Sequence, residues 1–354
     1  MKAVLCIDEA VGERRRTLLD ADGRPFRLAI DRWSERGRRA RLDDVWWGRV
    51  KARMPGNRGW FVDLGLERYG IVEPTRAAIV TEGAMLAFRV KSEAWSDKGP
   101  ALSLADISPT IAAPDKPQLH KEAAEDAFLK GAEVIETRTG LPARREIDAA
   151  IAEATTPIAP LPGAGDISIE MTRGLAVIDV DAGARLGSQD AAAFALDLNL
   201  AAALEAARQI GLRNLAGLLA IDFVRMESRR DQRTVAERFR QTLAEHLGRA
   251  SEVLELSPLG VCEAAIARRA WPLAEAIAAA PAEREALNAL REIETAGLTD
   301  RGVRIKARIS AAAKHWLDAD TIGWQAALGD RIGQRWLIEV SDNPLSRPEV
   351  WSAT

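Results

Sequence analysis

The chain has 354 residues, 47% of them hydrophobic, and a formal net charge of −3. This length is enough to bury a sizeable core in two or three domains, and the hydrophobic content is typical of a globular protein. The two cysteines, Cys6 and Cys262, are too few for a disulfide framework or a structural zinc site. No apolar run approaches about 18 residues and the start lacks the plan of a signal peptide, so we expect a cytoplasmic protein without a membrane partner.

The first 42 residues are predicted to form strands joined by tight turns, because Asp-Ala-Asp-Gly at 20–23 is a hairpin signal followed by alternating apolar residues. The first sixty residues also hold fifteen Lys or Arg against nine Asp or Glu. Such a basic cluster either follows the phosphates of a nucleic acid or forms a solvated surface, and the composition leaves both interpretations open.

Five short strands are expected between residues 43 and 108, the strand number of an OB-fold. We place them at 45–51, 59–65, 69–72, 86–91 and 101–104. An OB-fold binds single strands by stacking bases on aromatic side chains and by holding phosphates with cations. Trp60 and Phe61 are neighbours on one strand and point to opposite faces, so we expect one of them, but not both, to face a ligand.

Seven prolines between residues 109 and 162 bracket two expected helices, a charged one at about 119–131 and a second at about 143–154. Further along, a helix is expected at 231–247. Beyond residue 271, an Ala/Glu-rich helix leads to a strand at 303–309, whose outer row is Arg304, Lys306 and Arg308. That row either contacts phosphates or discourages aggregation at a sheet edge. Helices at 311–317 and 322–332 and a strand at 335–340 complete a small α+β module.

Two apolar runs of strand length end on carboxylates, the first at Asp179 and Asp181 and the second at Asp222. Continuous apolar runs suit strands that are covered on both faces. Apolar residues recur at helical spacing from 196 to 210, and Gly211 follows where a helix end is expected. If the two strands are parallel neighbours, this helix is the crossover and the three carboxylates converge.

Three clustered carboxylates repel one another unless a cation neutralises them, and oxygen ligands select a hard ion such as Mg²⁺ or Mn²⁺. The same aspartates could instead cap turns after the strands, and the pattern alone leaves both interpretations open. Acyl-transfer chemistry is not expected, because His120, His246 and His315 are scattered without a nucleophile partner.

The stretches Ala-Val-Ile-Asp-Val-Asp-Ala-Gly at 176–183 and Leu-Leu-Ala-Ile-Asp-Phe-Val-Arg-Met at 218–226 resemble the catalytic core of the ribonuclease E/G family, and residues 48–70 resemble its RNA-binding OB-fold. The resemblance implies a multidomain α+β and α/β fold, in which an RNase H-like and DNase I-like nuclease core carries an inserted OB-fold barrel and a small C-terminal α+β domain. The expected divisions are N-terminal strands packing with the nuclease core (1–42), an OB-fold RNA-binding domain (43–108), an abbreviated connecting region (109–165), a metal-dependent nuclease core (166–270) and the C-terminal domain (271–354).

By the same resemblance, Asp179 and Asp222 are the metal ligands, with Mg²⁺ as the cofactor and Mn²⁺ as a substitute. Asn199 matches an asparagine near the site that orients an aspartate or the backbone, and Asp181 stands where the family usually has asparagine. The expected RNA-binding residues are Phe61 for a base, Lys98 for a phosphate, and Trp60 and Arg268 beside them.

The implied function is a Mg²⁺-dependent endoribonuclease that cleaves single-stranded RNA by metal-activated water, in RNA processing or decay, with ribosomal RNA maturation as one candidate task. The chain departs from the family at four positions: Ile71, Asp181, Pro258 and Ile266. These departures support the alternative, a catalytically weakened or inactive RNA-binding protein on the same scaffold.

Two further features of the longer family members are not carried over. The Cys-Pro-x-Cys element that links subunits through zinc is absent from the sequence, so we expect no zinc and a monomer or a homodimer that is not zinc-linked. Arg138-Thr139 superficially resembles the Arg-Thr pair of the pocket for the 5′-monophosphate of RNA, but its flanks do not match. A preference for 5′-monophosphorylated ends is therefore not predicted.

Overall fold

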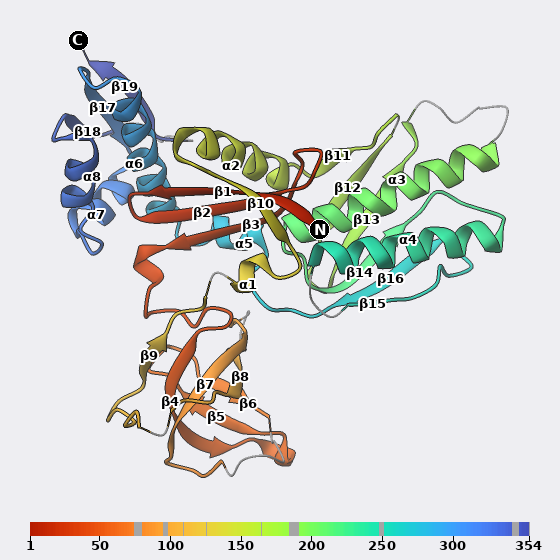
Figure 1. The fold of residues 1–354 in the computed structure, drawn as a ribbon, viewed down its shortest axis with the longest axis horizontal. Coiled ribbons are helices and arrows are strands. Elements are labelled where there is room, and N and C mark those ends of the chain that lie inside the picture. The colour runs from red at the N-terminus through yellow and green to blue at the C-terminus, as the bar shows by residue number, and fades with distance from the viewer. Residues whose placement is uncertain are drawn as a thin grey trace.

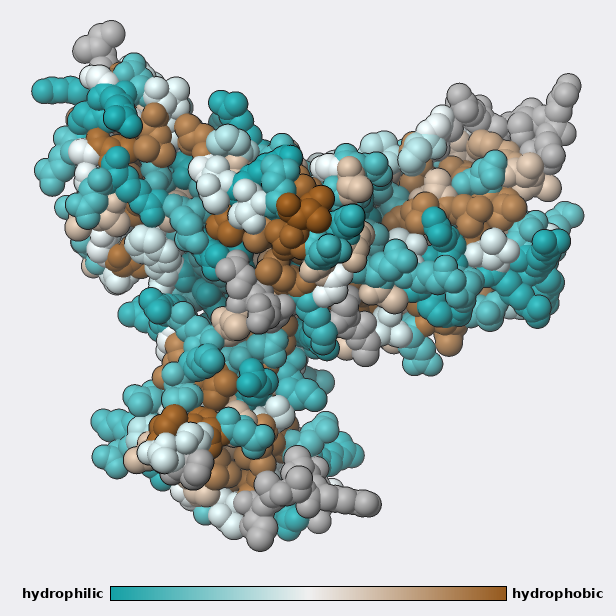
Figure 2. Space-filling model, in the orientation of Figure 1, coloured by the Kyte–Doolittle hydropathy of each residue, from teal (hydrophilic) through white to brown (hydrophobic). Residues whose placement is uncertain are grey.

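The computed structural model describes residues 1–73, 80–94, 98–108, 110–124, 126–163, 165–183, 191–247, 251–341 and 347–353. The chain forms a mixed α/β protein with three lobes (Figure 1). A β-barrel forms the lower lobe, a small α/β unit at the C-terminus forms the upper left lobe, and a sheet covered by two long helices forms the right lobe. The N-terminal sheet lies where the three meet, and the hollows between the lobes are visible in the space-filling view (Figure 2).

The N-terminal sheet has the strand order β10-β1-β2-β3, and helix α2 packs on it. Its elements are β1 (Lys2–Ala10), β2 (Glu13–Leu19), β3 (Pro25–Arg32), β10 (Glu133–Thr139) and α2 (Gly140–Thr155). Helix α2 confirms the helix expected at 143–154. The helix expected at 119–131 is wrong, because the described part of that stretch contains strand β9 (Gln118–Lys121) and the four-residue helix α1 (Asp126–Leu129). Pairing with the barrel supplies β9 with backbone partners that the local sequence does not reveal.

Within the described residues, five strands close into a barrel in the order β4-β5-β6-β8-β7 and back to β4, with β6 parallel to β8. They are β4 (Val45–Arg53), β5 (Trp60–Asp63), β6 (Gly70–Val72), β7 (Met85–Ser92) and β8 (Ala101–Leu104). This is an OB-like barrel, as the sequence predicts. Strand β9 adds to the outside of β4, so the sheet of the barrel extends beyond residue 108. Two short 3₁₀ turns, Trp33–Glu35 and Pro55–Asn57, lie before β4 and after it.

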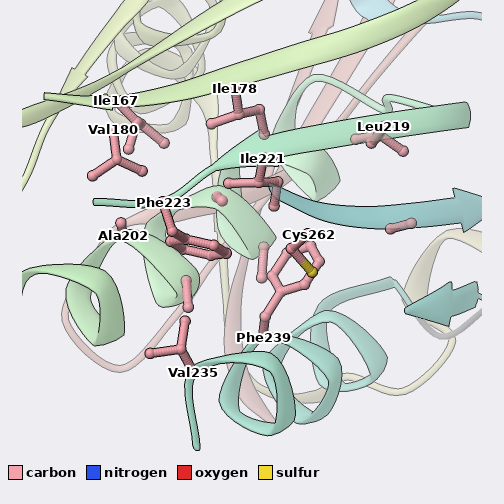
Figure 3. Close-up of a cluster of buried hydrophobic side chains, with 14 of the residues drawn as sticks. Ile167, Ile178, Val180, Ala202, Leu219, Ile221, Phe223, Val235, Phe239 and Cys262 are labelled. Carbon is pink, nitrogen blue, oxygen red and sulfur yellow. The ribbon is translucent and has the colours of Figure 1, made fainter. Parts of the chain in front are cut away.

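The right lobe is a six-stranded sheet of order β11-β12-β13-β14-β16-β15, and two helices cover one of its faces. The elements are β11 (Ile158–Pro160), β12 (Asp166–Met171), β13 (Leu175–Asp181), α3 (Ala191–Leu212), β14 (Gly217–Asp222), α4 (Arg229–Leu247), β15 (Ser251–Val253) and β16 (Val261–Ile266). Figure 3 shows the contact layer, in which Ile178 and Ile221 of the sheet meet Ala202 of α3 and Phe239 of α4. The expectation that the apolar runs are covered on both faces is wrong, since only this face is closed.

The C-terminal lobe packs its helices on one face of a sheet of order β18-β17-β19. Its elements are α6 (Pro281–Thr299), β17 (Arg304–Ile309), α7 (Ala311–Asp318), α8 (Trp324–Ile332), β18 (Trp336–Val340) and β19 (Glu349–Ala353). Helix α5 (Leu273–Ala278), which precedes them, packs instead with the N-terminal sheet and α2. The alternation expected for β17 is confirmed, because Ile305, Ala307 and Ile309 are fully buried. None of the described helices combines the length and the apolar character needed to cross a bilayer.

The basic cluster of the first sixty residues lies around a cleft of about 560 Å³ between the N-terminal sheet and the barrel. Its arginines are neutralised by neighbouring acids: Arg16 and Arg41 pair with Asp31, and Arg39 pairs with Glu35 and Glu93. The cluster therefore joins the lobes. None of the site residues predicted from the sequence lines this cleft.

A buried ion network ties the N-terminal sheet to the C-terminal lobe. Asp8 of β1 is 1% exposed and accepts hydrogen bonds from Arg144 of α2, at 2.9 Å, and from Arg291 of α6. Arg144 also donates to Glu294 at 3.0 Å. A buried ion pair stabilises the fold little more than a well-packed apolar pair would. Removing one partner, however, leaves a buried charge without compensation and destabilises the fold.

We therefore expect Asp8→Asn to lower the free energy of unfolding by about 3–5 kcal/mol, measured by urea denaturation. The control is Glu9→Gln on the same strand, whose exposed carboxylate pairs with Arg14 and whose loss is expected to cost less than about 1 kcal/mol. Equal effects of the two substitutions would contradict the role assigned to Asp8.

Candidate active site on the open face of the core sheet

Asp179 and Asp222 are direct neighbours on two parallel strands. In the register of β13 and β14, Ile178 lies opposite Ile221 and Asp179 lies opposite Asp222. Residues opposite each other on adjacent strands point to the same side, with backbones about 4.8 Å apart. The convergence expected from the strand–helix–strand pattern is therefore confirmed for these two residues, and α3 is the crossover.

The two aspartates lie on the face of the sheet that the helices leave open. Ile178 and Val180 of β13 are buried on the helix side, whereas Asp179 and Asp181 between and after them are exposed. Val177 lies on the open face with Asp179 and is half-buried. The carboxylates are thus held by a rigid sheet yet reachable from solvent.

Strand β12 adds acidic and polar groups to this face that the sequence analysis did not single out. Ser168 lies opposite Asp179 and Asp166 lies opposite Asp181. Partial burial raises the pKa of Asp179 above its ordinary value, and repulsion from Asp222, Asp181, Asp166 and Glu170 raises this pKa further. The sequence does contain a signal for this strand and its polar face: polar and apolar residues alternate from 166 to 170, and Ile167 and Ile169 are buried between the polar residues.

The donor set fits a hard divalent ion held by two carboxylates. Among the described residues no group of three or more His, Cys, Asp or Glu side chains could hold a metal, so the expected three-aspartate centre is corrected to a pair. The Asp181 carboxylate instead accepts a hydrogen bond from the backbone N–H of Gly183 at 2.8 Å. Mg²⁺ is typically bound through one or two carboxylates together with water and substrate phosphates, which is what an exposed pair offers.

Both cysteines are unsuited to metal binding here. Cys6 and Cys262 are fully buried, and desolvation raises the pKa of each thiol to about 11. Cys262 points to the helix side of β16, away from the aspartates (Figure 3).

Asn199 lies behind the sheet and does not reach the open face. Its side chain is fully buried, donates to the carbonyl oxygen of Val224 at 2.7 Å and accepts from the backbone N–H of Val224 at 3.0 Å. It therefore fastens α3 to the segment that follows Asp222. Of the two roles that the sequence left open, orienting an aspartate or orienting the backbone, the structure shows contact with the backbone.

On the barrel, the structure separates the two candidate aromatics. Trp60 packs against the barrel core, whereas Phe61 is half-buried, points outward and lies opposite Ile71. The exposed Lys98 precedes a segment that lies against the start of β6, where the backbone N–H of Ile71 donates to the carbonyl oxygen of Pro100 at 2.8 Å. Phe61 and Ile71 thus share one side of the barrel, whereas Trp60, which is also half-buried, packs against the barrel core.

The remaining predicted positions are scattered. Arg268 is exposed beside Gly217 at the start of β14, five residues and roughly 16 Å along the strand from Asp222. Ile266 is buried on the helix side, so its side chain does not belong to the open face. Pro258 is exposed in the turn before β16, whose Val261 lies opposite Asp222.

Arg138 of β10 is held by Glu136 at 2.7 Å, so its guanidinium already has an anionic partner.

Replacing Asp222 by Asn removes one repelling charge, so we expect the pKa of Asp179 to fall while burial keeps it above its ordinary value. An acid whose pKa is raised in the folded state destabilises the fold once it ionises. The variant should therefore unfold less readily than the parent at neutral pH and lose this advantage in acid, where both carboxyls are protonated. NMR titration of carboxyl carbons and urea denaturation measure the two effects. An unchanged Asp179 pKa would show that the carboxylates do not interact.

Asn199→Ala leaves both backbone groups of Val224 without their partner, and we expect a loss of about 2–3 kcal/mol in the free energy of unfolding. Asn214→Ala is the comparison, since that asparagine is only half-buried and its side chain donates to the carbonyl oxygen of Trp271, outside the segment that follows Asp222. Hydrogen exchange should show faster exchange of the Val224 amide in Asn199→Ala alone. Protection unaltered by Asn199→Ala would contradict the positioning role.

Comparison with known proteins gives a consistent assignment for this part of the chain. Residues 116–269 match the model of the Ribonuclease E/G family. The chain is 45% identical to Ribonuclease E of Nostoc sp. and 39% identical to Ribonuclease E of Synechocystis sp., in each case over 117 residues that make up 33% of this chain and 17% of the relative. It is 35% identical to a Ribonuclease E/G-like protein of Porphyra purpurea over 131 residues, 37% of this chain and 25% of the relative. The matches thus cover a quarter or less of each relative. The segment that holds Asp179 and Asp222 therefore lies within the stretch that matches the Ribonuclease E/G family model.

Proposed function

We propose that the chain is a Mg²⁺-dependent endoribonuclease of the ribonuclease E/G type that cleaves single-stranded RNA. The observation that carries this proposal is the pairing of Asp179 with Asp222 on the open face of a sheet whose sequence matches that family. Carboxylates placed side by side and exposed raise the energy of the fold, and a bound cation removes that cost. We further propose RNA processing or decay in the cytoplasm, by a monomer or a homodimer without a zinc link.

Asp179 and Asp222 would bind the ion and fix it against a scissile phosphate. When bound, a divalent ion supplies a water of lowered pKa and a Lewis acid that neutralises charge on the phosphoryl oxygens. The open face leaves room for an RNA strand to lie across β13 and β14, because the covering helices are on the other side. Hydrolysis in this geometry is proposed to leave a 3′-hydroxyl and a 5′-phosphate.

The proposed division of labour follows the domains expected from the sequence. Residues 43–108 bind RNA through Phe61, which lies opposite Ile71 on the barrel, and through the exposed Lys98. Residues 166–270 cut it. Residues 1–42 and 109–165 form the platform between these two units, to which the C-terminal domain, 271–354, is joined through Asp8. An aromatic and a cation on the face of strands two and three are typical of OB-fold ligand sites.

The rival proposal, a weakened or inactive RNA-binding protein, is favoured by one observation. The open face carries Glu170, Asp181 and Glu263 in addition to the metal pair, and these carboxylates repel a phosphate that no ion screens. A test of function must therefore read binding and cleavage separately.

The test uses a 5′-labelled single-stranded A/U-rich RNA with and without Mg²⁺. We expect internal cleavage that needs Mg²⁺ and that falls at least about 100-fold in Asp179→Asn and in Asp222→Asn, the scale of a lost electrostatic contact in a transition state. Asp330→Asn, on exposed helix α8, is the matched control and should cleave like the parent. RNA that is bound by the parent but remains intact with Mg²⁺ would establish the rival proposal.

A further inference from the structure

Among the described residues, no helix packs on one of the two faces of the C-terminal sheet. Helices α6, α7 and α8 pack on the face that carries Ile305, Ala307 and Ile309. Val350 of β19 belongs to the same packed layer, so its neighbour Trp351 points to the opposite face. On that face Leu337 is 50% exposed, and Arg304 and Glu349 are exposed as well. This helix-free face is a solvated platform built from β17, β18 and β19.

The register places an aromatic side chain beside a cationic row. Lys306 of the central strand β17 lies opposite Leu337 on one side and Trp351 on the other. The guanidinium of Arg308 lies over the Trp351 ring, 5.3 Å from its centroid, and is 3.4 Å from the Glu349 carboxylate. The cations of β17 repeat every second residue, about 7 Å apart along the strand, so each can meet a different phosphate.

Two of the cations have no carboxylate of their own. Arg308 pairs with Glu349, but neither Arg304 nor Lys306 forms an ion pair within the part of the chain that the structure describes. Many other arginines of this protein are matched with acids, as around the cleft between barrel and N-terminal sheet. The positive charge of the platform is therefore concentrated at Lys306, the strand position that faces Trp351, and at Arg304, two residues before it.

We propose that this platform is a second binding surface for single-stranded RNA, in which a base stacks on Trp351 and phosphates contact Arg304 and Lys306. Aromatic side chains on an open sheet face, flanked by cations, are a general solution for binding single strands. An acidic polypeptide would use the cations but would gain nothing from a flat indole, so the combination favours RNA. The inference rests on the proposed function insofar as RNA is the ligand.

The platform would hold RNA away from the point of cleavage. It lies in the C-terminal lobe, on the other side of the N-terminal sheet from β13 and β14 (Figure 1). Its role would therefore be to retain long RNA, and a short RNA that reaches only the barrel and the aspartates would not depend on it. This separates the platform from the cleavage chemistry in any test.

The binding test uses the full chain carrying Asp179→Asn, so that RNA stays intact, and a long fluorescent single-stranded RNA followed by anisotropy. Trp351→Leu, which keeps apolar bulk but cannot stack, is expected to weaken binding by about 5- to 100-fold, while Trp351→Phe stays within about threefold. Lys306→Gln should lower the slope of log affinity against log salt by about 0.7, the value for one lost phosphate contact. The matched control is Lys314→Gln on α7, whose lysine already pairs with Asp318.

Cross-linking identifies the surface directly. RNA containing 4-thiouridine, irradiated on the same protein, is expected to label the peptide of residues 347–353 in addition to the barrel. Binding by Trp351→Leu and Lys306→Gln that equals the parent, with labels confined to the barrel, would overturn the proposal. A second result would also overturn the proposal: polyglutamate that displaces the RNA with the same affinity from the parent and from Trp351→Leu. This would indicate that the platform binds acidic proteins.

The two proposals fail in distinguishable ways. If the chain does not cleave RNA, the binding test on the Asp179→Asn protein still decides the platform. If the platform is wrong, Mg²⁺-dependent cleavage of a short RNA by the otherwise unaltered chain is unaffected. Thermal unfolding of each variant checks that Trp351→Leu is folded, and the Trp351→Phe protein distinguishes lost stacking from lost packing.

Discussion

The arrangement of this protein depends on two carboxylates that are kept side by side against their repulsion. At the spacing of neighbouring strands, two unit charges repel by about 1 kcal/mol in water and by several times more near a protein surface. Opposing this, Ile178 and Ile221 are fully buried one residue before Asp179 and Asp222, and burial of each such side chain contributes about 1.5–3 kcal/mol. The core on the helix side thus fixes the register of β13 and β14. The same register places the two carboxylates side by side on the other face.

The same asymmetry explains how a folded sheet can present a reactive surface. Helices α3 and α4 both lie on one side, and Asn199 clamps the segment after Asp222 to α3 from behind. The open side is free for a long polymer, whereas a sheet covered on both faces would offer only its edge. The C-terminal sheet repeats the plan, with helices on one face and Trp351 on the other. Two half-covered sheets and a barrel are the three surfaces that we propose for RNA.

Much of this could be predicted from the sequence, because the relevant signals are local. The strand–helix–strand order around α3, the alternation of β17 and the outward choice between Trp60 and Phe61 follow from periodicity. Other features depend on partners distant along the chain. Strand β9 forms by pairing with β4, and only the pairing of β12 with β13 brings Asp166 to Asp181. The continuous apolar runs led to the wrong expectation that both faces of these strands are covered. Val177 and Ala220 are small enough to remain half-exposed on an open face.

The central claim is that Asp179 and Asp222 together hold one divalent ion. Titration of the chain with Mn²⁺, followed by electron paramagnetic resonance of the free ion, measures this without any RNA. The account predicts one specific site in the parent that competes with Mg²⁺ and is lost in Asp179→Asn and in Asp222→Asn alike. Mn²⁺ bound equally well by the parent and by both variants would contradict it.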